Sequence, residues 1–222
     1  MNEQDSSGIS LGMYGSLGGQ TARQERRDAA ANRTLILETA EKLFAARGVE
    51  HVNMADIAQA AGVGKGTLYR RFANKGELCL ALMDTQMSEF QNNILGRMQK
   101  MTIEEVKNIE QLAHFLEALV FFTDVHSPLL CEVQRAGLLQ DIDNTQLQLP
   151  HFWQHMTVSG LLKKGVQAGE INPNIDIEYI SDALLAPLKA DFFRFQREVR
   201  GFSLERISNG LRMILEGVAG WS

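Results

Sequence analysis

The most constraining feature of the chain is a pair of glycines in the segment AGVGKGTLYRRF, residues 60–71. The two glycines of Gly62-Val63-Gly64 are typical of a tight turn, in which the valine is left to fill the core between the flanking helices. The residues before the turn, MADIAQAA, have the apolar spacing of a helix rather than that of a strand. The segment therefore predicts two short helices, over about 54–61 and 65–73, joined by a glycine-containing turn.

A glycine-flanked lysine followed by a threonine also suggests a nucleotide-binding phosphate loop. Such a loop needs a glycine, four further residues and then Gly-Lys-Ser/Thr, and it follows a strand. With Gly64 and Lys65 as the Gly-Lys pair, the first glycine would have to stand at position 59, which is Gln59. The residue after the lysine is Gly66, so the hydroxyl that would hold Mg²⁺ is out of place. We therefore interpret this segment as one that meets the phosphates of a nucleic-acid backbone, not those of a nucleotide.

Two asparagines carry the signals of helix N-termini. Asn53 is a good N-cap and has an acidic residue, Asp56, in the capping-box position three residues later. Asn74 is followed in the same way by Glu77. Helices are therefore expected to begin directly after both asparagines.

An amphipathic helix over about 32–47 is expected before this unit. Its apolar residues recur at helical spacing and lie on one face, at Ile36, Ala40, Leu43 and Phe44. Gly48 follows, where a helix-ending residue with positive φ would stand. Two helices joined by a short turn, with a third helix packed behind them, make a helix-turn-helix.

The rest of the chain is typical of a larger helical domain. Strong helix formers are plentiful and β-branched runs are few, so we expect an all-α protein. Pro187 should kink the helix that contains it. Helices are expected near residues 77–97, 103–123, 127–140, 150–168, 176–199 and 203–218.

Charge is distributed unevenly along the chain. The net charge of −5 at pH 7 argues by itself against a nucleic-acid partner. Residues 21–76, however, hold ten Lys or Arg and six Asp or Glu, whereas residues 77–222 hold 12 and 19. The part of the chain around the glycine turn is therefore basic, and the larger remainder is acidic.

Cysteine content and hydropathy indicate a location inside the cell. Cys79 and Cys131 are far apart and form no Cys-x-x-Cys pair, which suits a reducing cytoplasm. The N-terminus is acidic and lacks the apolar core of a signal peptide. No apolar run approaches the ~20 residues that a membrane-spanning helix needs. We expect a cytoplasmic protein without a membrane partner.

The second helix of a helix-turn-helix enters the major groove of DNA with its N-terminal residues at the base edges. Lys65 and Thr67 would then face bases or phosphates, and the Tyr69 hydroxyl would reach a phosphate oxygen. The charge of Lys75 is unfavourable at the start of its helix, because it opposes the helix dipole, but a bound phosphate would make the interaction favourable. The alternative is that Lys75 is a solvated lysine. The residues expected to contact DNA are Arg33, Asn53, Gly64, Lys65, Gly66, Thr67, Tyr69, Arg70, Arg71 and Lys75.

Residues 33–82, and above all NMADIAQAAGVGKGTLYRRFANKGEL, resemble the N-terminal domain of the TetR/AcrR family of bacterial transcriptional regulators. The likeness includes Asp-Ile-Ala, Ala-Gly-Val, Gly-Thr-Leu-Tyr, an aromatic residue at 72 and Asn-Lys at 74–75. The family often has Ser or Thr where Gly64 stands and His where Arg71 stands. The resemblance implies a homodimer of about nine helices per chain that binds a palindromic operator and is released by a small effector.

This resemblance divides the chain into three segments. We predict a disordered tail over 1–20, a helix-turn-helix DNA-binding domain with a basic arm over 21–76, and an effector-binding and dimerisation domain over 77–222. The arm carries Arg23, Arg26, Arg27 and Arg33. Extended N-termini of the family can reach the minor groove, whose negative potential suits arginine; a charged, solvated extension is the alternative.

Two further sets of residues are candidates for the larger domain. Small molecules bind helical bundles between helices, so aromatic residues there would favour a lipophilic or aromatic effector. At helical spacing, however, an aromatic residue is more often an ordinary core residue. The candidate pocket residues are Phe115, Phe121, Phe122, Phe152, Trp153 and Phe192. The last helices resemble the two-helix dimerisation region of the family, and the candidate interface residues are Ile180, Leu184, Leu188, Leu204, Ile207, Leu211, Ile214 and Val218.

Other chemistry finds little support in the sequence. His151 and His155 are four apart, but no acidic or cysteine neighbour in the sequence completes a metal site, so we expect no metal and no cofactor. Gly-x-Ser-x-Gly and His-Glu-x-x-His are both absent. The leading hypothesis is a ligand-responsive DNA-binding repressor rather than an enzyme. The alternatives are a helical dimeric interaction module that has lost specific DNA binding, and an all-α enzyme that uses the aromatic cavity.

Overall fold

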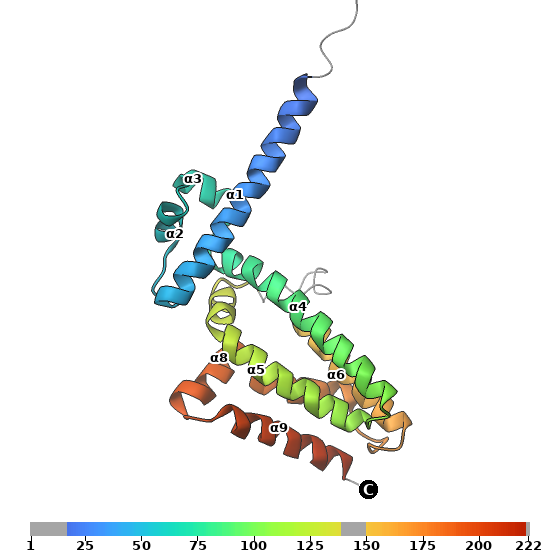
Figure 1. Cartoon of the computed structure of the whole chain (residues 1–222). Coiled ribbons are helices and arrows are strands. Elements are labelled where there is room, and N and C mark those ends of the chain that lie inside the picture. The colour runs from blue at the N-terminus through green and yellow to red at the C-terminus, as the bar shows by residue number, and fades with distance from the viewer. Residues whose placement is uncertain (1–16, 139–149, 221–222) are drawn as a thin grey trace, which may run out of the picture.

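The computed structural model describes residues 17–138 and 150–220, and the side chains of residues 27–138 and 152–220. Every regular element within these ranges is helical, as the sequence predicts (Figure 1). A small unit made by the first three helices lies at one end of a larger helical domain. The expected fold class, a helix-turn-helix unit followed by a larger helical domain, is therefore confirmed.

The N-terminal unit consists of α1 (Leu17–Arg47), α2 (Met54–Ala60) and α3 (Lys65–Tyr69). The apolar face predicted for the first helix packs into the core of this unit, with Phe44 among its buried residues. Gly48 follows α1 with a φ of +83°, as predicted for a helix-ending glycine. The third helix ends at Tyr69 rather than near residue 73, and the chain continues through a short turn to Asn74.

Helix α1 is much longer than predicted. It begins at Leu17 rather than near residue 32, so the last four residues of the expected disordered tail are helical, while residues 1–16 lie outside the described part. The segment TARQERRDAAA consists mainly of strong helix formers but has no apolar face. Apolar periodicity therefore missed it. The first half of α1 projects beyond α2 and α3 (Figure 1).

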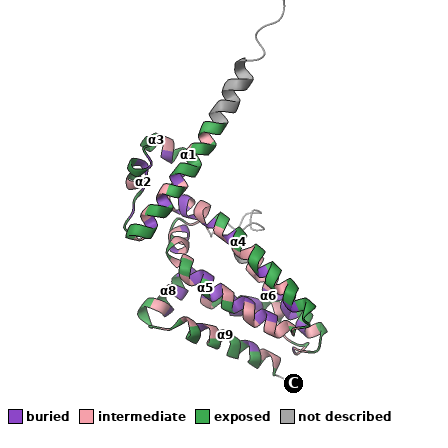
Figure 2. Cartoon of the chain, viewed as in Figure 1, coloured by how far each residue is buried: buried purple, intermediate pink, exposed green. Residues whose placement is uncertain are grey.

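The larger domain is built from long helices followed by short ones. It contains α4 (Lys75–Ile103), α5 (Asn108–Arg135), α6 (Pro150–Gln167), α7 (Ile177–Leu185), the 3-10 turn η2 (Ala186–Leu188), α8 (Ala190–Arg194), the π-helical turn η3 (Phe195–Val199) and α9 (Leu204–Ala219). Buried residues concentrate along α5, which lies between α4 and α9 (Figure 2).

Helix α5 joins two helices that the sequence predicts as separate, over 103–123 and 127–140. Pro128 lies inside it and cannot donate a hydrogen bond to the carbonyl of Asp124. The Ser127 hydroxyl donates to that carbonyl instead, at 3.3 Å. The expected break was wrong because a neighbouring side chain satisfies the acceptor that proline leaves open.

At Pro187, where the sequence predicts only a kink, the helix is interrupted. The helix expected over 176–199 is divided into α7, η2, α8 and η3, and Lys189 between η2 and α8 has an extended backbone. The side-chain amide of Gln196 in η3 donates a hydrogen bond to the Pro187 carbonyl at 2.8 Å. A side chain therefore satisfies this backbone acceptor where the helix is interrupted.

The start of α5 is capped from a distant part of the chain. Lys107, at its N-cap position, makes no side-chain capping bond. Glu170, in the loop after α6, accepts hydrogen bonds from the Asn108 side-chain amide and the Ile109 backbone N–H, both at 3.0 Å. This contact fixes the α6–α7 loop against α5.

Two buried clusters make up the core, and α5 contributes to both. Leu112, Phe115 and Leu119 from its first half belong to the cluster of the larger domain. Val133, near its C-terminal end, belongs to the cluster that holds α1, α2 and α3 together. Helix α5 therefore runs without interruption from one core to the other.

Candidate functional site

The turn between α2 and α3 has the geometry that the sequence predicts. Gly62 has a φ of +66°, which suits glycine, and Gly64 is extended at the N-cap of α3. Val63 packs against the core of the N-terminal unit, and Leu68 on the inner side of α3 is fully buried. Because Val63 and Leu68 pack inward, the opposite side of α3 faces solvent.

The start of α2 is fixed by a complete capping box. The Asn53 side-chain oxygen accepts from the backbone N–H groups of Ala55 at 2.9 Å and Asp56 at 3.0 Å. The Asp56 carboxylate accepts from the Asn53 N–H at 2.9 Å. The predicted cap is confirmed, and the oxygen of Asn53 is engaged in orienting α2.

Exposed residues lie on the outer side of this unit (Figure 2), and several of them are polar or basic. Tyr69 is 51 % exposed, and the Arg70 guanidinium lies 3.5 Å from the Thr67 hydroxyl. Arg33 of α1 lies over the Phe72 ring, 5.5 Å from its centroid. The residues of the predicted DNA-contacting set that are exposed are Arg33, Asn53, Gly64, Lys65, Gly66, Tyr69, Arg70 and Arg71, with Thr67 half-buried.

Lys75 lies apart from this exposed set. Its ammonium Nζ is 3.7 Å from Oε2 of Glu132 on α5, and 6.0 Å from the centroid of the Phe44 ring. The Lys75 side chain is only 17 % exposed. The Asn74 side chain caps α4 by accepting from the Glu77 N–H at 2.9 Å, as predicted. The structure therefore places Lys75 at the junction of α4 with α5.

The larger domain contains an aromatic cluster between α4, α5 and α6. The ring centroids of Phe90 and Phe122 are 4.4 Å apart, and those of Phe115 and Trp153 are 5.5 Å apart. Trp153 also meets Phe90 edge-on at 6.1 Å. Three of the predicted pocket residues thus come together. The other three, Phe121, Phe152 and Phe192, have exposed side chains.

A histidine at this cluster, and a glutamine one helical turn from Phe90 on α4, were missed in the sequence. The His126 ring packs against Phe122 at 4.3 Å, and burial lowers the pKa of His126 below its ordinary value. Gln86 lies one turn before Phe90 on α4, and its buried Oε1 has no hydrogen-bond partner within the described residues. The i, i+4 spacing of Phe122 with His126 and of Gln86 with Phe90 is the signal that would have found them.

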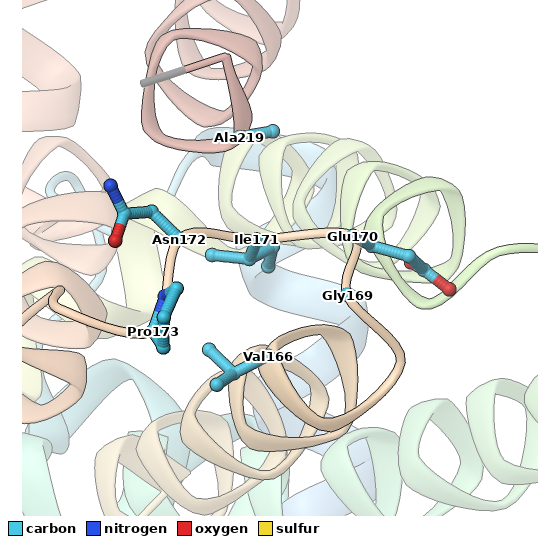
Figure 3. A pocket seen from close by; sticks show the side chains of 7 residues that line it. All are labelled: Val166, Gly169, Glu170, Ile171, Asn172, Pro173 and Ala219. Carbon is cyan, nitrogen blue, oxygen red and sulfur yellow. The ribbon is translucent and has the colours of Figure 1, made fainter. Parts of the chain in front are cut away.

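A separate cavity of about 400 Å³ lies where the α6–α7 loop meets the end of α9 (Figure 3). It is at the end of the larger domain away from α2 and α3 (Figure 1). None of the predicted pocket residues lines it. Its lining consists of Val166, Gly169, Glu170, Ile171, Asn172, Pro173 and Ala219.

Most of the residues predicted for the dimer interface, which come from α7, η2 and α9, pack within their own chain instead. Leu184, Leu188, Ile207 and Leu211 are buried in the core of the larger domain, and Ile180, Leu204 and Val218 pack against that core. The spacing marks a covered helix face, but it does not tell whether the same chain or a partner covers it. Ile214 is half exposed, and its neighbour Met213 is 71 % exposed.

His155 has partners that the sequence reasoning did not find. Its Nε2 lies 2.8 Å from Glu178 and its Nδ1 lies 3.1 Å from Asp182, and both carboxylates come from α7. The two carboxylates face opposite ring nitrogens, which ties α6 to α7 rather than forming a chelate. No group of three or more metal-ligand side chains occurs among the described residues, and the His151 side chain lies outside them.

Sequence comparison identifies the family. A model of the family described as "Bacterial regulatory proteins, tetR family" matches residues 36–82, which cover α2, α3 and most of α1's buried face. An HTH-type transcriptional regulator of Staphylococcus aureus (strain MRSA252) is 31 % identical over 186 residues, which are 84 % of this chain and 93 % of that protein. The chain belongs to the TetR family of transcriptional regulators.

Solved structures share the fold of this TetR-family regulator. A transcriptional regulator from Saccharomonospora viridis in complex with choline has a TM-score of 0.64 at 18 % identity, over 84 % of this chain and 96 % of that one. The TetR-family repressor FadR of Thermus thermophilus, in complex with lauroyl-CoA, has a TM-score of 0.59 at 19 % identity, over 83 % and 93 %. Within the described residues of this regulator, no helix is long and apolar enough to cross a membrane.

Proposed function

We propose that this TetR-family regulator is a cytoplasmic homodimeric repressor that binds a palindromic operator and is released by a small lipophilic or aromatic effector. One observation carries the proposal. Leu68 and Val63 bury the inner side of the turn and of α3, so that Lys65, Tyr69 and Arg70 stand together on the outside. A basic surface on an otherwise acidic protein is suited to a polyanion.

Gel retardation with DNA from upstream of the regulator's own gene tests DNA binding. We expect specific retardation that weakens as salt rises, because phosphate contacts release counterions. Lys65→Ala should weaken binding about tenfold, and Tyr69→Phe should weaken it similarly on all sequences. Lys100→Ala, which removes an exposed lysine near the far end of α4, is the matched control. Absence of specific retardation would favour the alternative function, a helical dimeric module without specific DNA binding.

The aromatic cluster is the proposed effector site. Its rings Phe90, Phe122 and Trp153 offer apolar contact, and the lowered pKa keeps His126 uncharged at neutral pH. The unpartnered oxygen of Gln86 can accept a hydrogen bond from a ligand donor. Such a lining suits a lipophilic or aromatic body with a polar group. Two structural neighbours hold choline and lauroyl-CoA, which makes these molecules suitable first probes.

Tryptophan fluorescence tests this site. The chain has two tryptophans, so Trp221→Phe leaves Trp153 as the single reporter. A probe bound at the cluster should change Trp153 emission in a saturable way and release labelled DNA over the same concentration range. A probe that releases DNA while Trp153 emission stays constant would place the effector elsewhere, for example in the 400 Å³ cavity beside α9.

Dimerisation is supported by apolar side chains that the chain itself leaves uncovered. Met213 and Ile214 on α9 and Tyr179 on α7 are large and exposed. Singly exposed apolar residues are common, but Met213 and Ile214 are adjacent on a helix whose opposite face is fully packed. We propose that this outer side of α9 contacts the second subunit.

A further inference from the structure

The first turn of α4 lies directly against the last turn of α5. A Cβ atom added to Gly76 would lie 2.3 Å from the Ala136 Cβ and 3.0 Å from the Glu132 backbone oxygen. No side chain can therefore separate the two helices at this point. The contact fixes the position of residue 75 relative to residue 132.

Lys75 and Glu132 form an ion pair in this junction. The Lys75 Nζ is 3.7 Å from Glu132 Oε2, and the two side chains are 17 % and 15 % exposed. The other carboxylate oxygen, Oε1, accepts a hydrogen bond from Arg135 at 2.5 Å. Because both partners are largely covered, salt screens this pair less than it screens a pair on the open surface.

Lys75 also follows the proposed DNA surface closely in sequence. It is the first residue of α4, and only Arg70–Asn74 separate it from the end of α3. A cation at a helix N-terminus is disfavoured by the helix dipole unless an anion lies nearby. In the free protein Glu132 supplies that anion, and in a DNA complex a phosphate would supply it.

We propose that Glu132 is a positioning residue that competes with a DNA phosphate for the Lys75 ammonium. Duplex binding then requires Lys75 to exchange one anionic partner for the other, and the strength of the α4–α5 ion pair limits the affinity for DNA. This inference rests on the proposed DNA-binding function and adds a means of regulating it.

The course of α5 makes this competition a route for regulation. The helix carries Phe115 and Phe122 of the aromatic cluster and, further along, Glu132 and Val133 at the N-terminal unit. A ligand that shifts α5 would move the Glu132 carboxylate relative to Lys75. The balance between the two anionic partners would change with it.

A double-mutant cycle on duplex binding tests the competition. Fluorescence anisotropy would follow binding of a labelled duplex of random sequence, because phosphate contacts do not depend on sequence. Glu132→Gln should tighten binding about fivefold, the effect of removing a pair of this kind. Lys75→Ala should weaken binding and lower the salt slope by about 0.9. The double variant should bind like Lys75→Ala alone.

Two control variants, each of which removes one carboxylate charge elsewhere, distinguish competition for Lys75 from a general change in the electrostatic potential of the protein. Glu50→Gln removes an exposed carboxylate whose pKa is lowered mainly by a backbone hydrogen bond and least by the Lys75 charge, and Glu104→Gln removes a carboxylate at the far end of α4. Both should change affinity less than about twofold. Helicity and melting temperature would be followed for every variant. If Glu132→Gln does not fold, Glu132→Asp keeps the charge but shortens its reach, and a smaller Lys75-dependent tightening is expected.

Two results would overturn the inference. One is that Glu132→Gln leaves duplex affinity unchanged or weakens it. The other is that Glu132→Gln tightens binding equally in the Lys75→Ala background. In both cases the wild-type protein still binds duplex DNA, so the proposed function stands. A wild-type protein that binds no duplex would overturn both.

Discussion

At the scale of the residue, Gly76 is the described glycine that leaves least room for a side chain. An alanine there would bring its Cβ within 2.3 Å of Ala136, so the two helices must separate. We expect Gly76→Ala to lower the free energy of unfolding by about 1–3 kcal/mol, as overpacking does. Gly96→Ala is the matched control, because the same helix has open space there, and it should stabilise the protein by roughly 0.5–1 kcal/mol. Urea unfolding measures both, and equal effects would contradict the packing described at Gly76.

Cys79 gives a second residue-scale prediction. Burial, helped by the charge of Glu132, raises the pKa of the Cys79 thiol from 9.0 to about 12. As the pH rises, the unfolded chain therefore loses the thiol proton before the folded chain does. The contribution of this thiol to the free energy of unfolding is complete below pH 9 and falls between pH 9 and 12. From pH 8 to 10.5, wild type should lose about 1–2 kcal/mol more than Cys79→Ala. Urea unfolding at the two pH values checks this, and equal losses would show that the thiol does not titrate in this way.

The sequence predicted the local roles of single residues well where the groups that interact are close together in the chain. The Asn53–Asp56 capping box, the Asn74 cap and the positive φ at Gly48 are all confirmed. Lys75 shows the limit of such signals. Its covered position follows from Glu132, which lies more than fifty residues further along the chain and which no local pattern connects to it.

At the scale of the element, the cap on α5 comes from a loop 61 residues away. Glu170→Ala leaves the Asn108 side-chain amide and the Ile109 N–H without this acceptor. We expect a loss of about 0.5–2 kcal/mol in the free energy of unfolding, the range for lost N-caps. Glu89→Ala, which removes an exposed carboxylate on α4, is the control in the same urea experiment. A loss no larger than that of Glu89→Ala would contradict a capping role for Glu170.

Helix boundaries followed the sequence wherever a local signal was strong. Met54 and Lys75 begin helices directly after the predicted caps, and Pro187 interrupts one. Pro128 does not interrupt α5, because Ser127 satisfies the Asp124 carbonyl. The extension of α1 back to Leu17 was missed, since its residues favour helix but form no apolar face.

At the scale of the whole molecule, the outer side of α9 is proposed to join two subunits. Light scattering should give about twice the 24.8 kDa mass of one chain for the wild type. Met213→Asp would place a charge in the proposed contact and should shift the mass toward that of one chain. Leu95→Asp, which alters an exposed apolar residue on α4, is the control and should stay dimeric. A dimer that survives Met213→Asp would place the interface elsewhere.

Whole-molecule features were predictable where they depend on composition and motif. The all-helical class and the helix-turn-helix unit followed from residues close together in the chain. Three residues of the aromatic cluster, Phe115, Phe122 and Trp153, were predicted as pocket residues. Phe90 and His126 were not predicted, because only the packing of α4, α5 and α6 brings them to the other rings. The apolar face of α9 was predicted to meet a partner subunit, but α5 of the same chain covers it.

Hydroxyl-radical footprinting of the operator shows whether the α3 surface meets DNA once in each subunit of a symmetric pair. We expect two protected patches on one face of the duplex, about ten base pairs or a multiple of that apart. Both patches should be lost together in Lys65→Ala and retained in Lys100→Ala. A single patch, or protection that is unchanged in Lys65→Ala, would rule out binding of the duplex by two symmetric α3 surfaces.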